Sequence, residues 1–350
     1  MNTERIIDVL TSSCRPTITV AGDYCLDKYL YIDAKLDEPS VETGLTAYQV
    51  REERLYPGVG GTISANLQSL GAKVRAVGVY GDDGDGFELI KALNKQGIET
   101  SGMTLCPGRY TNTYMKPMRE NASGVWTELN RMDIRNRLPV PELAVDQTLE
   151  QLRQAARTSE ALIISDQFTY ESGSVVTDRF RETVSLLHRE FENLIILVDS
   201  RSYIEKYQNV LVKCNADELI KAVRRLEGDE EAQTVAVDNS AACQTERIER
   251  AAQKLSALNN RPVVVTRGAR GSLVVSDGQI DYIPARKVEP PIDICGAGDA
   301  TNAGLAFGLS LGLPLNEAAY LAGIVSSITI KQIGVTGTAT VEQILAALRE

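Results

Sequence analysis

The chain has 350 residues, with 37 Lys and Arg against 47 Asp and Glu, giving a formal net charge of −10. This balance disfavours nucleic acid or an anionic membrane as a partner, so any phosphate binding must be local. The six cysteines form no CxxC pair and His188 is the only histidine, which argues against a zinc site. Without a signal-peptide pattern or an apolar run of about 18 residues, we expect a cytoplasmic protein.

Short β-branched runs alternate with amphipathic stretches along the chain. We expect strands at 17–22, 74–81, 161–166, 194–199, 210–213 and 262–266. We expect helices at about 86–96, 142–157, 173–191, 216–226, 244–258, 298–311, 316–331 and 340–349. The alternation predicts an α/β fold in which helices cover both faces of a mostly parallel sheet. The Asp277-Gly278 pair adds a hairpin late in the chain.

Two segments, about 28–56 and 108–135, interrupt this alternation and resemble strands joined by polar turns. We expect them to form a small β-sheet lid on a single domain spanning 1–350, because no linker divides the chain. Their alternating positions hold more apolar surface than a thin layer leaves in water. These positions are Tyr29, Tyr31, Tyr48, Val50, Tyr114, Met118, Val125, Leu129 and Met132. The pattern predicts a homodimer formed through the lids.

The stretch DICGAGDATNAG places Gly296, Ala297 and Gly298 at the start of an expected helix. Unpaired N–H groups and the helix dipole attract an anion at such a position. Asp299, directly after them, is suited to taking a proton from a hydroxyl that attacks a bound phosphate. The alternative is a tight strand-to-helix turn in which Asp299 is only a favourable first-turn charge.

Two further motifs follow expected strands. NADE places Asn215 and Glu218 in a capping-box pattern, although a strand end is also where α/β proteins bind ligands. TRGARG places Thr266, Gly268 and Gly271 in a turn that is either a phosphate contact or an ordinary β-turn.

Near the amino terminus, AGDYCLDKYL places Asp27 just beyond the first expected strand. A carboxylate there can accept hydrogen bonds from paired hydroxyls, and the alternative is a solvated loop aspartate. The stretch PGVGGTISANLQSLGA follows as a glycine-rich loop, with Gly58, Gly60 and Gly61 beside Thr62.

These motifs together resemble those of the PfkB, or ribokinase-like, carbohydrate kinases. Asp293 and residues 296–299 match the family's D-T-x-G-A-G-D signature, with Ile294 where threonine is usual. The resemblance implies a three-layer αβα ribokinase-like fold. It also implies Asp299 as the catalytic base and the amides of residues 296–298 as the anion hole for the transferred phosphoryl group.

The resemblance further implies ATP, Mg²⁺ and K⁺ as cofactors. Glu218 would hold Mg²⁺ through water with Asn215 near the phosphates, and Asp293 would lie near K⁺ together with the Cys295 carbonyl. The remaining implied contacts are Thr266, Gly268 and Gly271 to the nucleotide phosphates, Gly323 beside the adenine in place of an expected asparagine, and Asp27 with Gly58, Gly60, Gly61 and Thr62 to the sugar.

Within the family, the stretches VAGDYCLDKYLY, LNRMD and ILVDSRS resemble most the kinase domain of bacterial heptose-7-phosphate kinases. Two departures are Tyr114, where that group has a lysine, and the segment SDQFTYESG. Four basic residues remain candidates for binding a phosphorylated sugar: Lys116, Arg119, Arg131 and Arg201. The implied acceptor is a sugar or sugar phosphate, with a heptose phosphate as one candidate.

The sequence departs from the motifs of other nucleotide-binding enzymes. The chain lacks the G-x-G-x-x-G of a nicotinamide-binding enzyme after its first strand and the G-x-x-x-x-G-K-[ST] of a P-loop enzyme. The alternatives left open are a kinase for another small alcohol such as a nucleoside, and a non-catalytic sugar- or nucleotide-binding regulator. A regulator is expected to lose the base or the metal-binding group, yet Asp299 and Glu218 are both present.

Overall fold

The computed structural model describes residues 1–121, 123–170, 173–228 and 241–349. Parts of two expected segments, residue 122 of the lid and residues 171–172 of SDQFTYESG, lie outside the described residues. The described part of the chain contains no helix both long enough and apolar enough to cross a membrane.

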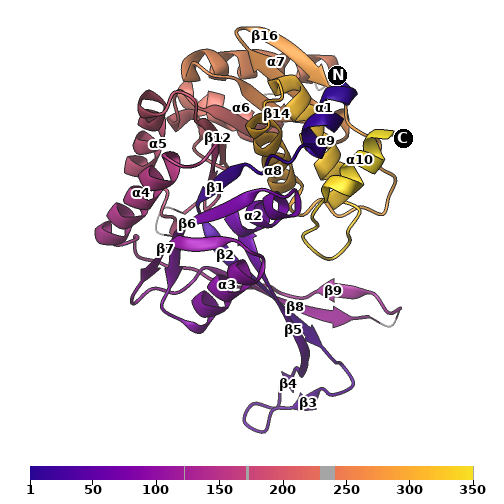
Figure 1. The fold of residues 1–350 in the computed structure, drawn as a ribbon. Coiled ribbons are helices and arrows are strands. Elements are labelled where there is room, and N and C mark those ends of the chain that lie inside the picture. The colour runs from indigo at the N-terminus through magenta and orange to yellow at the C-terminus, as the bar shows by residue number, and fades with distance from the viewer. Residues whose placement is uncertain (122, 171–172, 229–240, 350) are drawn as a thin grey trace.

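A large, mostly parallel sheet forms the centre of the molecule (Figure 1). Its described strands run in the order β16-β15-β14-β13-β12-β11-β1-β6-β7, and only β15 and β16 are antiparallel to their neighbours. The strand bounds are β1 Thr17–Gly22, β6 Lys73–Gly81, β7 Glu99–Cys106, β11 Ala161–Asp166, β12 Ile195–Ser200, β13 Leu211–Asn215, β14 Val263–Thr266, β15 Ser272–Ser276 and β16 Gln279–Ile283. The hairpin expected at Asp277-Gly278 joins β15 to β16.

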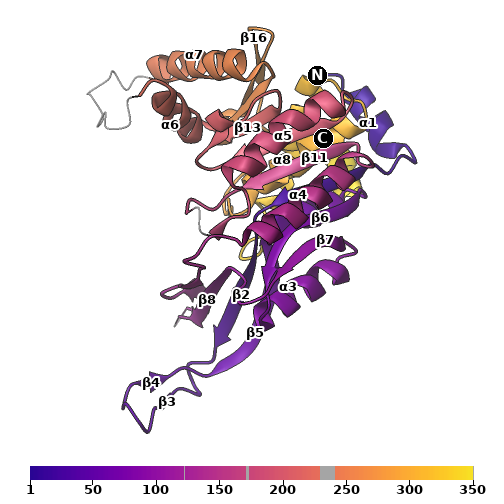
Figure 2. The same ribbon diagram turned by 90° about the vertical axis from the view of Figure 1, so that its left-hand side faces the viewer.

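Helices cover both faces of this sheet (Figure 2). The helix bounds are α1 Thr3–Thr11, α2 Gly60–Ser69, α3 Gly84–Lys95, α4 Glu142–Ala156, α5 Asp178–Glu190, α6 Ala216–Leu226, α7 Ala241–Asn259, α8 Ala297–Ser310, α9 Leu315–Thr329 and α10 Val341–Arg349, with short 3₁₀ turns η2 Ile204–Lys206 and η3 Gly268–Arg270.

Successive residues of the central strands pack into different cores. Ala161 and Ile163 of β11 join the cluster containing α2, α8 and α9, whereas Leu162 and Ile164 join the cluster containing α4 and α5. This follows because adjacent strand residues point to opposite faces, and it explains why a strand buried on both sides is apolar throughout. The expected three-layer αβα fold is confirmed.

A second, smaller sheet projects from the body, as Figure 1 shows. It contains β2 Tyr24–Ile32, β5 Val50–Val59, β8 Thr113–Glu120, β9 Trp126–Glu128 and β10 Met132–Ile134. β2 pairs antiparallel with β5 and parallel with β8. A short hairpin of β3 Glu38–Pro39 and β4 Thr46–Ala47 extends beyond it. We call this sheet and hairpin the projecting sheet.

One expected helix begins later than the pattern indicates. The amphipathic pattern predicts a helix from residue 173, but α5 begins at Asp178, with Thr177 as its N-cap accepting a hydrogen bond from Phe180 N. The preceding residues serve a loop instead, because the Ser174 hydroxyl accepts a hydrogen bond from Val176 N and donates one to Asp23 Oδ1. Such tertiary contacts are invisible to hydrophobic periodicity.

Close packing at the junction between the two sheets makes Gly22 important for stability. Gly22 ends β1 with φ +121°, and a Cβ there would lie 2.3 Å from the Ser165 carbonyl oxygen. Gly22→Ala should therefore lower the free energy of unfolding by about 2–4 kcal/mol, from steric overlap and backbone strain. Gly108→Ala is the matched control, because Gly108 has φ +74° but open space around its Cβ position. If urea unfolding gives the same loss of unfolding free energy for both variants, steric overlap at Gly22 is unimportant.

Candidate active site

Two cavities meet at the amino end of α8. One, of about 350 Å³, is lined by Cys295, Gly296 and Asp299, and the other, of about 490 Å³, by Ala297 and Gly298. We call them the acceptor cavity and the donor cavity respectively. A single turn of backbone therefore separates the two cavities.

The backbone at this turn depends on its glycines. Gly296, the N-cap of α8, has φ +75°, and a Cβ there would lie 2.6 Å from Thr336 Cγ2. The Ala297 N–H closes the turn by donating to the Ile294 carbonyl at 3.1 Å. Because its N–H is used in the turn, Ala297 does not offer that group to an anion, whereas the Gly298 N–H belongs to the first turn of α8, where N–H groups lack intrahelical partners.

Asp299 lies in the first turn of α8 and faces the acceptor cavity. Burial and the nearby Asp199 carboxylate together raise its pKa to about 7, against the opposing charges of Lys213 and Arg201. A carboxylate with a pKa near neutrality is a better proton acceptor than an ordinary aspartate, and it still ionises at cellular pH.

A buried lysine lies beneath this turn. Lys213 of β13 donates to Asp199 Oδ2 of β12 at 2.9 Å, and Asn302 of α8 donates to the same oxygen. A Cβ on Gly298 would lie 3.2 Å from Lys213 Nζ, so the glycine lets the ammonium approach the backbone. Although burial lowers the pKa of Lys213, Asp199 raises it, and the net shift is upward. The ammonium therefore stays charged next to the proposed anion hole.

The acceptor cavity contains an ion pair on the projecting sheet. Asp27 Oδ1 of β2 lies 2.8 Å from Lys116 Nζ of β8, and Lys116 also donates to the Tyr29 hydroxyl at 3.1 Å. Lys116 is only 9% exposed. Asp27 is therefore a carboxylate with one oxygen already bound to an ammonium rather than a solvated loop residue.

Guanidinium groups line the rest of this cavity. Arg131 and Arg135 both pair with Asp133, at 2.6 and 2.7 Å, and both lie over the Tyr114 ring. Arg201 lines the cavity as well, with its Nε 3.3 Å from Gln167 Oε1. Three of the four basic residues singled out from the sequence thus reach this cavity, and Arg119 is bound to Asp37 at 2.5 Å instead.

The glycine-rich stretch contributes to the site mainly through close packing. A Cβ would lie 2.6 Å from Cys25 Sγ at Gly58, 2.9 Å from the Asp23 carbonyl at Gly60, and 2.3 Å from Pro57 Cβ at Gly61. Thr62 lines the acceptor cavity and these glycines do not. They let β5 and α2 lie close to β2, which brings Thr62 to the acceptor cavity.

The donor cavity is lined by the other glycine turn and by α9. Thr266, Gly268, Gly271 and Gly323 all face it, alongside the apolar side chains Ile283, Ile292, Ile294 and Ile330. A Cβ at Gly323 would meet no atom within 4 Å, so this position is open. The mixture of a glycine turn at one end and aliphatic walls suits a ligand with an anionic group and a flat apolar part.

The expected metal residues lie beside the cavities rather than among their lining residues. Asn215 and Glu218 form a complete capping box at α6, with Asn215 N donating to Glu218 Oε2 at 2.8 Å and Glu218 N donating to Asn215 Oδ1 at 2.9 Å. Burial raises the pKa of Glu218, and Asp199 adds to that rise. The Asp293 carboxylate accepts hydrogen bonds from Cys295 N and Gly334 N, so it connects the segment before α8 to the loop after α9.

Sequence reasoning missed several residues that the structure brings to the site. Lys213 carried a signal, because a lysine inside the apolar run VLVKCN is unusual in a buried strand. Arg135, which lines the acceptor cavity, carried none, and Gln167 and Tyr170, which also line it, were indicated only as part of the departing segment SDQFTYESG. Their positions depend on how β10 and the loop after β11 fold back over β2.

A comparison with protein families gives a match to the pfkB family carbohydrate kinases over residues 24–341. The chain belongs to that family. The matched range contains the residues that line both cavities, including Asp27 and the α8 signature.

Individual relatives agree with this assignment. The bifunctional protein HldE of Trichlorobacter lovleyi is 30% identical over 333 residues, which cover 94% of this chain and 62% of the relative. The chain thus spans less than two thirds of the length of this curated relative. Ribokinase from Thermotoga maritima has a similar fold, with a TM-score of 0.65 and 20% identity over 96% of this chain and all of the other. Phosphofructokinase-2 from Escherichia coli, in complex with potassium, has a TM-score of 0.69 and 18% identity over 96% of this chain and 100% of the other.

Proposed function

We propose that this pfkB family member transfers the γ-phosphoryl group of ATP to a hydroxyl of a sugar phosphate. The observation that carries the proposal is the meeting of two cavities at residues 295–299, with Asp299 on one side and the Gly298 backbone on the other. A nucleotide in the donor cavity would place its terminal phosphate at this turn, where a hydroxyl in the acceptor cavity reaches it.

The chemistry requires no covalent enzyme intermediate. The acceptor hydroxyl oxygen attacks the γ-phosphorus while its proton passes to the Asp299 carboxylate, and the bond from that phosphorus to the bridging oxygen breaks to release ADP. N–H groups at the end of α8 and the Lys213 ammonium stabilise the charge on the equatorial oxygens. Arg201, close enough to influence Asp299, adds a further positive charge.

Two cations complete the proposal. Glu218 fits an Mg²⁺ held through water, because its carboxylate is half-buried and near Asp199, where added positive charge is favourable. Mg²⁺ would neutralise the nucleotide phosphates. Asp293 and the Cys295 carbonyl fit K⁺ beside the α8 turn, and the phosphofructokinase-2 with a similar fold was solved with potassium.

The charges of the acceptor cavity favour a phosphorylated sugar. Lys116 and three guanidinium groups, from Arg131, Arg135 and Arg201, face it together with Asp27 and Asp299. Planar guanidinium pairs bind phosphate well, whereas the Asp27 oxygen not bound to Lys116 can accept bonds from hydroxyls. A heptose phosphate fits this combination, consistent with the sequence resemblance to heptose-7-phosphate kinases.

The proposal is tested by ADP release with Mg²⁺ and K⁺ against matched free and phosphorylated pentoses, hexoses and heptoses. We expect phosphorylated sugars to give a higher kcat/KM than their free counterparts. Asp299→Asn should lower kcat on the best acceptor by about 100-fold or more while ATP binding is retained. The wild-type rate should rise with pH through about 7, as Asp299 loses its proton.

Two results would contradict this function. Undiminished turnover in Asp299→Asn would remove Asp299 as the base. Tight nucleotide or sugar binding without any turnover by the wild-type protein would favour the non-catalytic regulator.

The Mg²⁺ role of Glu218 is separable from its capping role. Glutamine satisfies a capping box as glutamate does, so Glu218→Gln should change the melting temperature little. We expect the Mg²⁺ concentration for half-maximal rate to rise by about 5-fold or more, because a carboxylate that attracts the ion is lost. An unchanged Mg²⁺ requirement measured at fixed ATP would restrict Glu218 to the helix cap.

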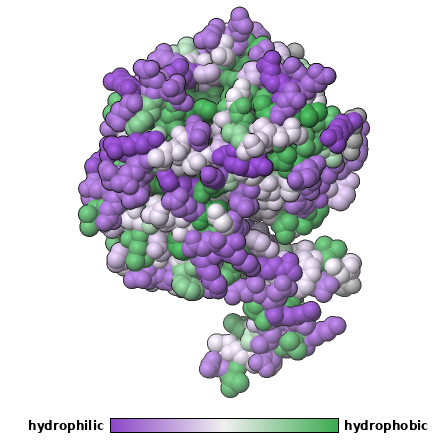
Figure 3. Space-filling model, viewed as in Figure 1, coloured by the Kyte–Doolittle hydropathy of each residue, from purple (hydrophilic) through white to green (hydrophobic). Residues whose placement is uncertain are grey.

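We also propose a homodimer through the projecting sheet. Tyr48, Val50, Val125 and Met132 are about half exposed there, at 50%, 48%, 55% and 52%. Figure 3 shows hydrophobic and hydrophilic residues intermingled on the projecting part. An apolar surface of this kind on a thin sheet is typical of an interface with a second subunit.

Val50→Asp should convert this dimer to a monomer, because a carboxylate would be buried opposite its symmetry mate. Sedimentation at about 20 μM protein should then give the monomer mass, with weaker acceptor binding. Leu258→Asp is the control, since Leu258 is similarly exposed, at 49%, on α7 of the body. The interface through the projecting sheet would be refuted if the wild-type protein sediments as a monomer. It would also be refuted if Leu258→Asp, and not Val50→Asp, converts the dimer to a monomer.

A further inference from the structure

Asp23 occupies the point where the chain passes from the body to the projecting sheet. β1 ends at Gly22 and β2 begins at Tyr24, so Asp23 alone separates a central strand from a strand of the projecting sheet. Its N–H donates to the Ser165 carbonyl at 2.8 Å, and its own carbonyl accepts from Gly60 N at 3.0 Å. Gly60 begins α2, where β5 returns from the projecting sheet. Asp23 lies on the first passage of the chain into the projecting sheet, and its carbonyl binds the second passage, where β5 leads back to α2.

The Asp23 side chain binds a third segment. Its Oδ2 accepts hydrogen bonds from Gln167 N and Phe168 N, both at 2.9 Å, and its Oδ1 accepts one from the Ser174 hydroxyl at 2.7 Å. Asp23 is 2% exposed. A carboxylate with several N–H and O–H donors forms stronger bonds than a neutral acceptor.

The segment it binds lines the acceptor cavity. Residues 167–170 face that cavity, and we call them the acceptor loop. At its far end, the Tyr170 hydroxyl is 3.4 Å from Asn112 Oδ1, and Arg135 lies over the Tyr170 ring at 5.0 Å. The loop therefore contacts the body at Asp23 and the projecting sheet at Asn112 and Arg135.

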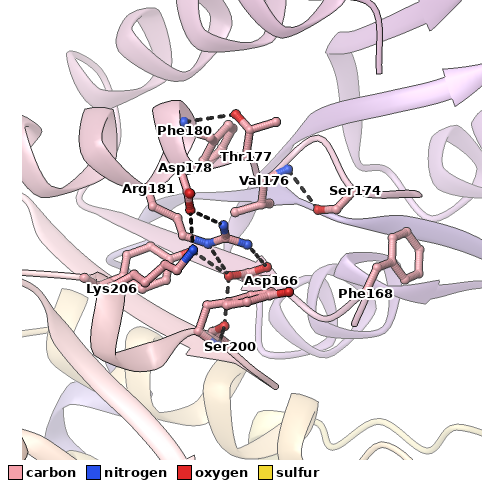
Figure 4. A network of polar contacts seen from close by, with 12 residues as sticks. Asp166, Phe168, Ser174, Val176, Thr177, Asp178, Phe180, Arg181, Ser200 and Lys206 are labelled. Atoms are coloured by element: carbon pink, nitrogen blue, oxygen red, sulfur yellow. Dashed lines mark hydrogen bonds and ion pairs between the residues drawn. The ribbon is translucent and has the colours of Figure 1, made fainter. Parts of the chain in front are cut away.

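A rigid group of side chains supports the near end of the loop. Asp166, the residue before it, accepts two bonds from Arg181, one from Ser200 and one from Tyr207 (Figure 4). In Figure 4, Phe168 and Ser174 lie on the segment that follows Asp166, and their side chains point away from the group around Asp166. Asp166 is thus fully occupied by its own partners, and the loop beyond it is held by Asp23.

We propose that Asp23 is a positioning residue that clamps the acceptor loop to the junction of the body and the projecting sheet, and so sets the affinity for the acceptor. The inference rests on the proposed function, because it assumes that the acceptor cavity binds the phosphoryl acceptor. Asp23 does not line either cavity, and its two oxygens are already bound. It therefore touches neither substrate nor nucleotide.

The main variant is Asp23→Ala, which removes all three side-chain bonds. We expect the acceptor KM to rise about 10-fold or more, while kcat at saturating acceptor and the nucleotide KM change by less than about 2-fold. Amide exchange at Gln167 and Phe168 should become faster, because both N–H groups lose their acceptor. Ser174→Ala, which removes a single bond to Asp23, should give a smaller rise of about 3-fold in acceptor KM.

Asp23→Asn is the rescue variant. Its amide oxygen can accept the two N–H groups and its NH₂ can donate to Ser174 Oγ, so the acceptor KM should stay within about 3-fold of wild type. Glu205→Gln is the matched control, since Glu205 is a partly buried carboxylate that is paired with Arg225 at 2.6 Å and lines neither cavity. It should lower the melting temperature without changing either KM.

The outcomes separate this clamp from the proposed function. Wild-type acceptor KM and wild-type amide exchange in Asp23→Ala would overturn the clamp, as would an Asn variant as impaired as the Ala variant. If Asp23→Ala does not fold, the same two measurements on Ser174→Ala decide the matter. If the wild-type protein phosphorylates none of the sugars, the proposed function fails, and amide exchange still tests whether Asp23 holds the loop.

Discussion

The site depends on one buried positive charge. Lys213 is 4% exposed and is held by Asp199, so its ammonium cannot leave the space under Gly298 without abandoning that partner inside the protein. Removing two charges from water costs about as much free energy as their attraction returns, so a buried pair contributes little net stability. What the pair does provide is a fixed positive charge below the end of α8, next to the carboxylate of Asp299.

The parallel sheet explains why these groups meet. Asp199 and Lys213 lie at the carboxyl ends of the neighbouring strands β12 and β13, and Asp23 follows the carboxyl end of β1. In an open parallel sheet this edge is where loops converge and ligands bind. The α8 turn lies above the same edge, so Asn302 reaches Asp199 from the helix while Lys213 reaches it from the sheet. Asp199, Lys213, Asn302 and Asp299 are therefore all positioned by regular strands and one helix.

The sequence predicts the parts of this arrangement that are encoded locally. Short apolar, β-branched runs predict the central strands, and small residues before Asp299 predict the α8 turn, because both patterns depend on neighbouring residues only. The acceptor side is different. Gly58, Gly60 and Gly61 suggest a ligand loop, yet a Cβ would lie within 3 Å of the β2 segment at Gly58 and Gly60, and of Pro57 at Gly61. Arg135 and the acceptor loop reach the cavity through contacts between β10, β8 and the segment after β11, which no local pattern records.

The replacement of an expected lysine by Tyr114 has a structural explanation. Tyr114 and Lys116 are two residues apart on β8, and alternate residues of a strand share a face, so Lys116 presents an ammonium to the same cavity one step further along. That shift places the ammonium against Asp27 and Tyr29. It also leaves the Tyr114 ring beneath the guanidinium groups of Arg131 and Arg135, which the aromatic face attracts. The acceptor cavity therefore holds one ammonium paired with the Asp27 carboxylate and two guanidinium groups stacked on Tyr114, and the proposed function assigns these guanidinium groups to an anionic group of the acceptor.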